Sequence, residues 1–131
     1  ADRPSPTNAW IQKYIFPGGY IPPLSQVMPA IEKAGLYVTD VEVLRLHYAE
    51  TLRDWRKRFH EKIEMVREIY DDRFCRMWDF YLCASEVSFR NSGLVVFQIQ
   101  LSKDLTELPL TRDYITELEE NELNPARVAA E

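Results

Sequence analysis

The chain has 131 residues, the usual size of one domain, so we expect a single hydrophobic core with at most a loose tail. Hydrophobic residues make up 46% and charged residues 28% of the sequence, a composition that is typical of folded globular proteins and argues against intrinsic disorder. The net charge of −5 disfavours nucleic acid as a partner. Without a run of about 18 apolar residues we expect neither a spanning helix nor a signal peptide, and hence a cytoplasmic protein.

The first third of the chain is rich in residues that interrupt regular structure. Two prolines predict an extended lead-in over residues 1–9, and a proline-glycine-glycine turn ends a short helix predicted over 9–16. Ser25 is the predicted N-cap of a second short helix, which Gly35 closes. This part of the chain therefore contributes short helices and stiff loops.

Two predicted strands flank a long helical region. Residues 36–46 are dense in β-branched and aromatic side chains, and residues 94–101 alternate apolar residues with glutamines, as a half-buried strand does. Between them, apolar residues at steps of three and four predict one helix over 48–69 and a second one that begins at Asp71 and stops at Asn91. The sequence therefore predicts an α+β fold in which an antiparallel strand pair is joined by a long helical hairpin.

The chain becomes acidic after Lys103 and loses most of its aromatic residues. We expect a helix over residues 113–122 and a frayed end over 124–131. These features divide the chain into a structured segment, residues 1–103, and an acidic C-terminal tail, residues 104–131.

The residue types that bind cofactors and metals are few. With four glycines and no glycine-rich motif, no loop can cradle a nucleotide-type cofactor through its backbone amides. The two histidines and two cysteines do not follow any compact zinc spacing. Cys75 and Cys83 lie eight residues apart on one predicted helix, about 12 Å along its axis, so we expect two reduced thiols and no metal site.

A basic run covers residues 53–59 and has two interpretations. It can meet phospholipid head groups, since each exposed cation near an anionic membrane contributes about 1 kcal/mol. The sequence favours the other interpretation, a solvated helix face that Glu61 and Glu64 balance.

Three stretches carry a resemblance: IQKYIFPGGYIP at 11–22, HYAETLRDW at 47–55, and FCRMWDFYLCASEVSFR with VFQIQL within 74–101. In order and spacing, from about residue 8 to 103, the chain resembles the C-terminal part of bacterial cyclopropane-fatty-acyl-phospholipid synthases and their mycolic acid relatives. PLTRDYI at 109–115 also resembles one branch of that family. The resemblance implies a parent enzyme that transfers a methyl group from S-adenosylmethionine to the cis double bond of a phospholipid acyl chain, forming a cyclopropane fatty acid.

The same resemblance implies what the chain lacks. The family's Rossmann-like class I methyltransferase fold has an upstream half that binds S-adenosylmethionine and carries the other bicarbonate ligands, and no such half is present in this sequence. We therefore expect neither S-adenosylmethionine nor bicarbonate to bind this chain alone. The polar start ADRPSPTN, without an initiator methionine, favours a piece of a longer protein.

Tyr81 is the catalytic residue that the resemblance implies. The family's tyrosine near the bicarbonate stands in a Tyr-Leu-x-x-Cys pattern, whereas here Cys83 comes two residues early and Ser85 fills the cysteine position. Such a tyrosine would donate its hydroxyl to the anion and position it. The residues alone favour another interpretation, in which Tyr81 is a core phenol that bonds to a backbone carbonyl, and they indicate that His47 is a structural residue rather than a base.

The resemblance also implies residues that contact the lipid. Trp78 and Ser85 would line the acyl slot around Tyr81, and Phe16 and Tyr20 belong to a loop close to where the lipid enters. Simple loop packing is the alternative for Phe16 and Tyr20. The implied partners are a phospholipid acyl chain and, for the parent enzyme, the inner face of the cytoplasmic membrane.

Two further expectations concern the isolated segment. A strand pair without neighbours exposes a sheet edge and an apolar face, so we expect a homo-oligomer, either a dimer or a strand-exchanged pair. The alternative to an enzyme fragment is a non-catalytic helical-hairpin module that binds protein or lipid. A membrane-surface module is disfavoured because neither long helix combines a strongly cationic face with low polarity.

Overall fold

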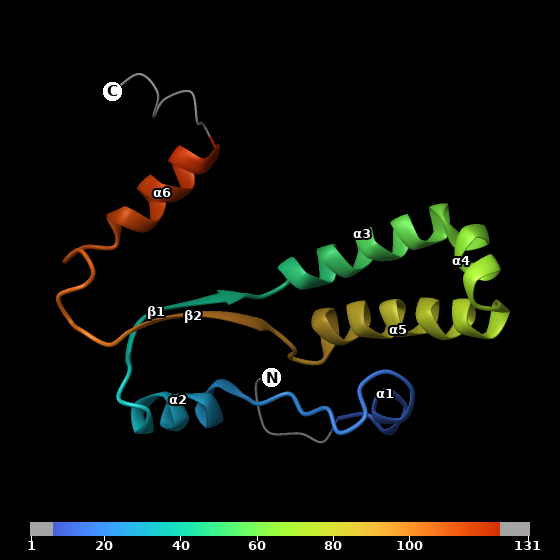
Figure 1. The fold of residues 1–131 in the computed structure, drawn as a ribbon, viewed down its shortest axis with the longest axis horizontal. Helices are drawn as coiled ribbons and strands as arrows, with labels where there is room; N and C mark the ends of the chain where they lie inside the picture. Colours follow the sequence, from blue (N-terminus) through green and yellow to red (C-terminus); the bar gives the residue numbers. More distant parts are fainter. Residues whose placement is uncertain (1–6, 124–131) are drawn as a thin grey trace.

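A two-stranded antiparallel sheet links a helical hairpin at one end to the second and the last helix at the other, while the short first helix lies beside the hairpin (Figure 1). This computed structural model describes residues 7–123. The elements are α1 (Ala9–Tyr14), α2 (Leu24–Lys33), β1 (Tyr37–Leu44), α3 (His47–Glu61), α4 (Ile63–Ile69), α5 (Asp72–Asn91), β2 (Val96–Ser102) and α6 (Asp113–Leu123). The predicted α+β class and the antiparallel pairing of the strands are confirmed.

The strand pair contains one irregularity. Val38 pairs with Leu101 and Asp40 with Gln100, so Thr39 is an extra residue on β1 and forms a bulge. The Thr39 hydroxyl donates to the Gln100 carbonyl at 3.3 Å. The bulge interrupts the regular side-chain alternation along β1.

The helical hairpin differs from the prediction at one point. The single helix expected over 48–69 is wrong, because the chain leaves helical geometry at Lys62 with φ −120° and ψ 15°. The break lets α4 turn back onto α5, with which it packs (Figure 1). The second arm is confirmed: the Asp71 carboxylate accepts a hydrogen bond from the Phe74 N–H at 2.7 Å and caps α5.

The N-terminal helices follow the prediction with two corrections. Helix α1 ends at Tyr14, two residues before the predicted end at residue 16, while Gly35 closes α2 with φ +71° as expected. The N-cap of α2 is Pro23 rather than Ser25, because Pro23 is buried and its fixed φ of −72° starts the helix two residues earlier. Pro29 consequently lies inside the helix, where it cannot donate the usual hydrogen bond to the Ser25 carbonyl.

The C-terminal segment contacts the sheet. The Tyr114 hydroxyl donates to the Gln100 side chain at 2.6 Å, and Arg112 forms an ion pair with Asp40. Helix α6 confirms the helix expected over 113–122. The expected extended lead-in lies mostly, and the frayed end wholly, outside the described residues, and the boundary at residue 103 stays a prediction.

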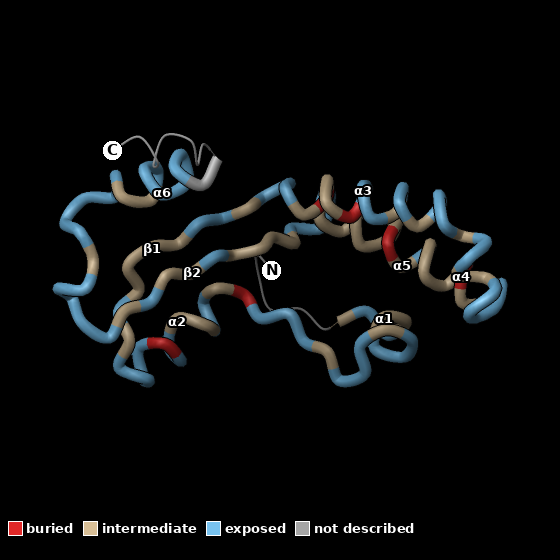
Figure 2. Tube along the Cα trace, turned by 45° about the horizontal axis from the view of Figure 1, so that its top comes forward, coloured by how far each residue is buried: buried red, intermediate tan, exposed pale blue. Residues whose placement is uncertain are grey.

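Little of the chain is buried (Figure 2). Leu52, Ala49, Cys75 and Leu82 form a thin core between α3 and α5, and Ile31 lies apart from them on α2. The accessible surface is 10186 Å², whereas a compact monomer of 15.4 kDa exposes about 7,200 Å². The single core expected from length and composition is therefore small, and many large apolar side chains lie at the surface.

Three expectations about special features can be compared with the described residues. Cys75 and Cys83 are both free thiols, as predicted. Within residues 7–123, His, Cys, Asp and Glu side chains do not gather in groups that could hold a metal ion. In the same range, every helix is too short or too polar to cross a bilayer.

Candidate functional site

Tyr81 lies midway along α5, enclosed by aromatic rings. The ring of Phe16, from the loop after α1, meets it edge-on with centroids 6.1 Å apart at 79°. Trp78 lies one turn earlier on α5, with its ring centroid 5.1 Å from that of Tyr81. The phenol is therefore half-buried among hydrocarbon side chains contributed by two separate parts of the chain.

The environment of the Tyr81 hydroxyl keeps it protonated. Burial raises the pKa of the Tyr81 phenol, and the hydrogen bond with Ser85 opposes that rise only in part. Tyr48, from α3, adds a smaller contribution that also raises the pKa. At neutral pH the phenol is neutral, so its O–H is available as a hydrogen-bond donor to an anion. The polar group that acts on the Tyr81 hydroxyl is the Ser85 side chain, where the residues alone indicated a backbone carbonyl.

The structure brings together four of the five site residues predicted from the sequence. Ser85 and Trp78 reach Tyr81 because residues three and four apart share one face of a helix. Phe16 reaches it through tertiary packing. Tyr20 is separate: its hydroxyl donates to Gln26 on α2, and 53% of the residue is exposed.

The turn after α1 explains why the side chains of Phe16 and Tyr20 lie in different places. The Gly19 N–H donates to the Phe16 carbonyl at 2.9 Å, closing a tight turn in which Gly18 has φ +73°. A Cβ on Gly19 would lie 3.0 Å from the Phe16 carbonyl oxygen, so a side chain there would force this tight turn to shift by a few tenths of an ångström. The turn directs Phe16 towards α5 and Tyr20 towards α2.

Tyr48 is a neighbour that the sequence analysis did not assign to the site. Its ring contacts Trp55 with centroids 5.8 Å apart and Phe89 at 4.9 Å, so it joins the two arms of the hairpin near Tyr81. Its place in the apolar stripe of α3 indicated only a core position. No signal in the sequence pairs the stripe of one helix with a given turn of another.

A polar cluster joins the same two helices further along the hairpin. The Arg56 guanidinium binds the Asp79 carboxylate through two hydrogen bonds of 2.7 and 3.1 Å, and His60 Nε2 lies 2.6 Å from the same carboxylate. The hydrogen bond from Arg56 lowers the pKa of Asp79, burial opposes this, and His60 lowers it further. Asp79 therefore stays ionised and ties α3 to α5.

This cluster corrects the interpretation of the basic run. Arg53 pairs with Glu50 and Arg56 with Asp79, while Glu64 pairs with Arg67 on its own helix. The predicted balance by Glu61 and Glu64 is wrong for Arg53 and Arg56, since these two arginines have other partners. The solvated face is thus partly a structural contact between the arms of the hairpin.

The described glycines do not form a cofactor cradle. Gly18, Gly35 and Gly93 have positive φ and lie in turns after α1, α2 and α5. None of these turns places successive backbone amides at the start of a helix of useful length, which is how adenosyl cofactors are held. The residues present do not fit S-adenosylmethionine, whereas the Tyr81 and Ser85 hydroxyls could contribute to an anion site.

Comparison with known proteins gives one matching family. The model of the mycolic acid cyclopropane synthetase family matches residues 2–99. A tuberculostearic acid methyltransferase of Mycobacterium tuberculosis is 43% identical over 100 residues, which cover 75% of this chain and 23% of the relative. The cyclopropane-fatty-acyl-phospholipid synthase of Escherichia coli is 32% identical over 96 residues, which cover 73% of this chain and 25% of that enzyme.

Solved structures resemble the chain over a similar share. A cyclopropane synthase from Mycobacterium tuberculosis superposes with a TM-score of 0.67 at 29% identity, covering 70% of this chain and 32% of the other. A mycolic acid cyclopropane synthase in complex with SAH and CTAB gives the same TM-score and coverage at 27% identity. The chain spans about a quarter of the length of the first curated relatives it matches.

Proposed function

Because the chain belongs to the mycolic acid cyclopropane synthetase family, we propose that it is the C-terminal segment of an S-adenosylmethionine-dependent lipid methyltransferase. Family membership confirms the resemblance carried by the three stretches of sequence. In the proposed parent enzyme the two strands described above complete a Rossmann-like class I sheet. The observation that carries the proposal is the collinear match over residues 2–99, together with a protonated phenol in an apolar surround.

The proposed reaction places a methyl group from S-adenosylmethionine on the cis double bond of a phospholipid acyl chain. Loss of one proton from that methyl group closes a cyclopropane ring and leaves S-adenosylhomocysteine. The relatives include enzymes named as fatty acid and sphingolipid methyltransferases as well as cyclopropane synthases. The nature of the product is therefore the finer part of the proposal.

Tyr81 is the residue we expect to act in this step. Its neutral O–H would donate to a bicarbonate ion and hold it beside the reacting carbon, where bicarbonate supplies the base for the departing proton. Ser85 would orient the phenol. Phe16 and Trp78 offer hydrocarbon against which an acyl chain can lie, and the exposed Tyr20 marks where the lipid enters.

The cofactor would be held by the remainder of the parent enzyme. No glycine-rich strand-to-helix turn is found in the described part of this chain, so we expect S-adenosylmethionine to bind the longer protein and not this segment. The lipid substrate implies work at the inner face of the cytoplasmic membrane as a peripheral protein. The segment contributes the acyl slot and one bicarbonate ligand.

A second function is favoured by one observation. Phe80, Met65 and Ile69 of the hairpin are each more than half exposed, as in a helical module that binds another protein or a lipid without catalysis. Such a module would bind its partner without S-adenosylmethionine, and loss of the Tyr81 hydroxyl would not affect binding.

The decisive experiment measures methyl transfer by the longer protein that contains this segment. Radiolabelled S-adenosylmethionine and vesicles of a cis-unsaturated phosphatidylglycerol are the substrates, and mass spectrometry of the fatty acid methyl esters identifies the product. We expect Tyr81→Phe to lower kcat by about a hundredfold, because a positioned donor to an anion is lost. Tyr70→Phe is the matched control, since Tyr70 is 62% exposed and keeps its ring contact with Phe74. Unlabelled lipid, or equal rates for both variants, would contradict the proposal.

A further inference from the structure

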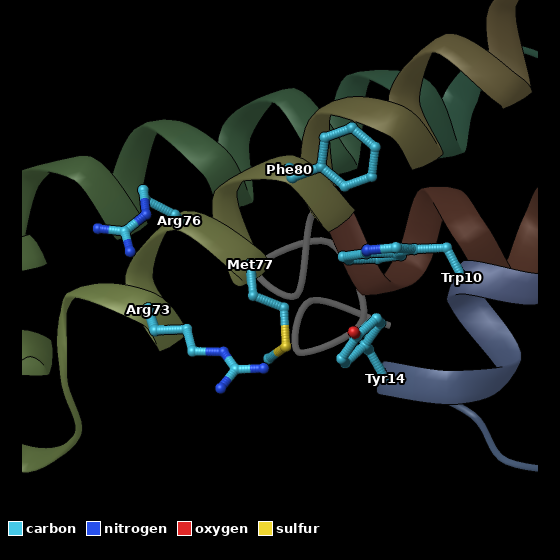
Figure 3. A pocket seen from close by; sticks show the side chains of 6 residues that line it. All are labelled: Trp10, Tyr14, Arg73, Arg76, Met77 and Phe80. Carbon is cyan, nitrogen blue, oxygen red and sulfur yellow. The ribbon is translucent and has the colours of Figure 1, made fainter.

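A groove of about 340 Å³ lies between α1 and α5, separate from the ring of Phe16 that covers Tyr81. Figure 3 shows Trp10 and Tyr14 of α1 opposite Met77 and Arg73 of α5, with the Arg76 side chain extending away from α1 at the edge of the groove. The lining residues are Trp10, Tyr14, Arg73, Arg76, Met77 and Phe80. Two segments about sixty residues apart in the sequence thus line the groove together.

One side of the groove is aromatic. The Trp10 ring packs edge-on against Phe80, with centroids 4.7 Å apart at 73°, and lies 5.3 Å from the ring of Tyr14. Phe80 is 54% exposed and Tyr14 is 38% exposed, so these rings keep apolar area open to a ligand. Rings fixed by one another lose little entropy when they bind a hydrocarbon chain.

The other side is cationic. Arg73 and Arg76 lie three residues apart on α5, and both are exposed. Within residues 7–123 neither guanidinium has an ion pair or a hydrogen bond. The positive charge of these two guanidiniums is therefore available to an anionic ligand that enters the groove.

The nearby carboxylates are occupied elsewhere, which leaves this charge uncompensated. Asp72 is bound by Arg67, and Asp79 is bound by Arg56 and His60. The ammonium group of Lys13, 5.1 Å from the Tyr14 ring centroid, adds a third cation beside the aromatic wall.

The combination selects an amphiphile. A phosphate group binds the planar guanidinium fork through two parallel hydrogen bonds, but it gains nothing from exposed rings, and a hydrocarbon chain has the opposite preference. We propose that this groove binds the glycerol end of an anionic phospholipid, with the phosphodiester on Arg73 and Arg76 and the first acyl carbons against Trp10 and Phe80. The inference rests on the proposed lipid methyltransferase function and names the substrate class as a phosphatidylglycerol-type lipid.

The position of the groove on α5 agrees with that function. Arg73 lies eight residues before Tyr81, about 12 Å along the helix axis. A lipid held by its phosphate at Arg73 and Arg76 would send an acyl chain along α5 towards the Tyr81 phenol. The groove would therefore set how far along the chain the methyl group is added.

The test titrates dihexanoyl phosphatidylglycerol, below its critical micelle concentration, into the full chain by calorimetry. We expect Arg73→Gln with Arg76→Gln to weaken binding by about tenfold or more, because two charge-assisted contacts are lost. Arg45→Gln with Arg58→Gln is the control, since both arginines are exposed, lack an ion pair within residues 7–123 and make the same change in net charge. Far-ultraviolet circular dichroism verifies that each variant keeps its helix content. If the helix content of the glutamine pair falls, Arg73→Lys with Arg76→Lys replaces it. This lysine pair keeps the charge and should weaken binding severalfold.

Two further ligands identify the source of the affinity. Glycerophosphoglycerol and inorganic phosphate should bind at least about tenfold more weakly than the diacyl lipid, and Trp10→Leu should weaken only the lipid. Equal affinity for inorganic phosphate, equal loss in both arginine pairs, or no binding of the lipid would each overturn the proposal.

The outcome can be separated from that of the proposed function. In the longer protein, Arg73→Gln with Arg76→Gln should raise KM for phosphatidylglycerol while leaving kcat close to the original value. If the KM for phosphatidylglycerol is unchanged by this substitution, the proposed lipid site in the groove is contradicted, while the proposed methyltransferase function stands. If the protein binds the lipid through these arginines but transfers no methyl group, the proposed lipid site stands and the proposed methyltransferase function is contradicted.

Discussion

Tyr81 is a residue whose surroundings follow in part from the sequence. Trp78 and Ser85 lie three residues before and four residues after it, so one helix places them on its face. Phe16 reaches it from a distant loop; the family resemblance assigned both residues to the site, but it did not predict their contact. The sequence could not separate Phe16 from Tyr20, because the direction of each ring depends on the closed turn at Gly19.

The raised pKa of Tyr81 predicts how stability depends on alkaline pH. An unfolded tyrosine loses its proton near pH 10.0, while burial keeps the Tyr81 phenol protonated to higher pH in the folded chain. Stability from this group is therefore complete below about pH 10 and is lost as the pH rises through the folded pKa. Urea unfolding from about pH 8 to pH 11 should show a steeper fall for the original chain than for Tyr81→Phe. Parallel curves would contradict the assigned burial.

Asp79 predicts the opposite dependence at acid pH. The hydrogen bond from Arg56 lowers the pKa of Asp79 below its ordinary 3.8 despite the opposing effect of burial. Its contribution is complete above that ordinary value and is lost as the pH falls through the lowered pKa. Asp79→Asn should reduce the free energy of unfolding at pH 7 by about 1 kcal/mol and flatten the acid limb. Asp54→Asn, with 58% of the carboxylate side chain exposed, is the control and should change stability little.

Among the elements, those with a local signal could be predicted. The N-cap at Asp71 and the long apolar stripe after it predicted α5, and the alternation of apolar and polar residues predicted β2. The break at Lys62 could not be predicted, because neither proline nor glycine occurs there and the apolar stripe continues through it. It arises from packing, since α4 turns to cover the first turns of α5.

The cap at Asp71 supports a prediction for the hairpin. Asp71→Ala removes the acceptor of the Phe74 N–H and should lower the free energy of unfolding by about 1 kcal/mol. Chemical unfolding followed by circular dichroism measures the loss. Glu68→Ala is the matched control, because Glu68 is exposed and its substitution removes the same negative charge from the preceding helix. Equal effects of the two changes would assign the loss to charge and not to capping.

The whole molecule exposes more surface than a chain of its mass should. The excess over a compact monomer is about 3,000 Å² by the usual scaling, larger than many stable interfaces bury from both partners together. Both strands of a two-stranded sheet are edge strands, with unpaired backbone groups along one side of each. Length and composition predicted a sufficient core, and they could not reveal that most apolar faces here lack a covering layer.

We therefore predict that the isolated chain self-associates through its sheet. Tyr37, Val43 and Leu101 of the strands are each exposed by more than 40%, and burying them with the strand edges would offset the loss of rotational freedom. Light scattering after size exclusion should give a dimer whose population falls on dilution. Leu101→Lys should shift the population to monomer, because a charge on an edge strand opposes edge pairing. Leu110→Lys is the control, since Leu110 is fully exposed outside the strands, and it should leave the dimer intact. A chain that is monomeric at every concentration would show that the exposed strand edges and apolar side chains do not associate by themselves. An equal effect of the two lysine substitutions would place the interface outside the sheet.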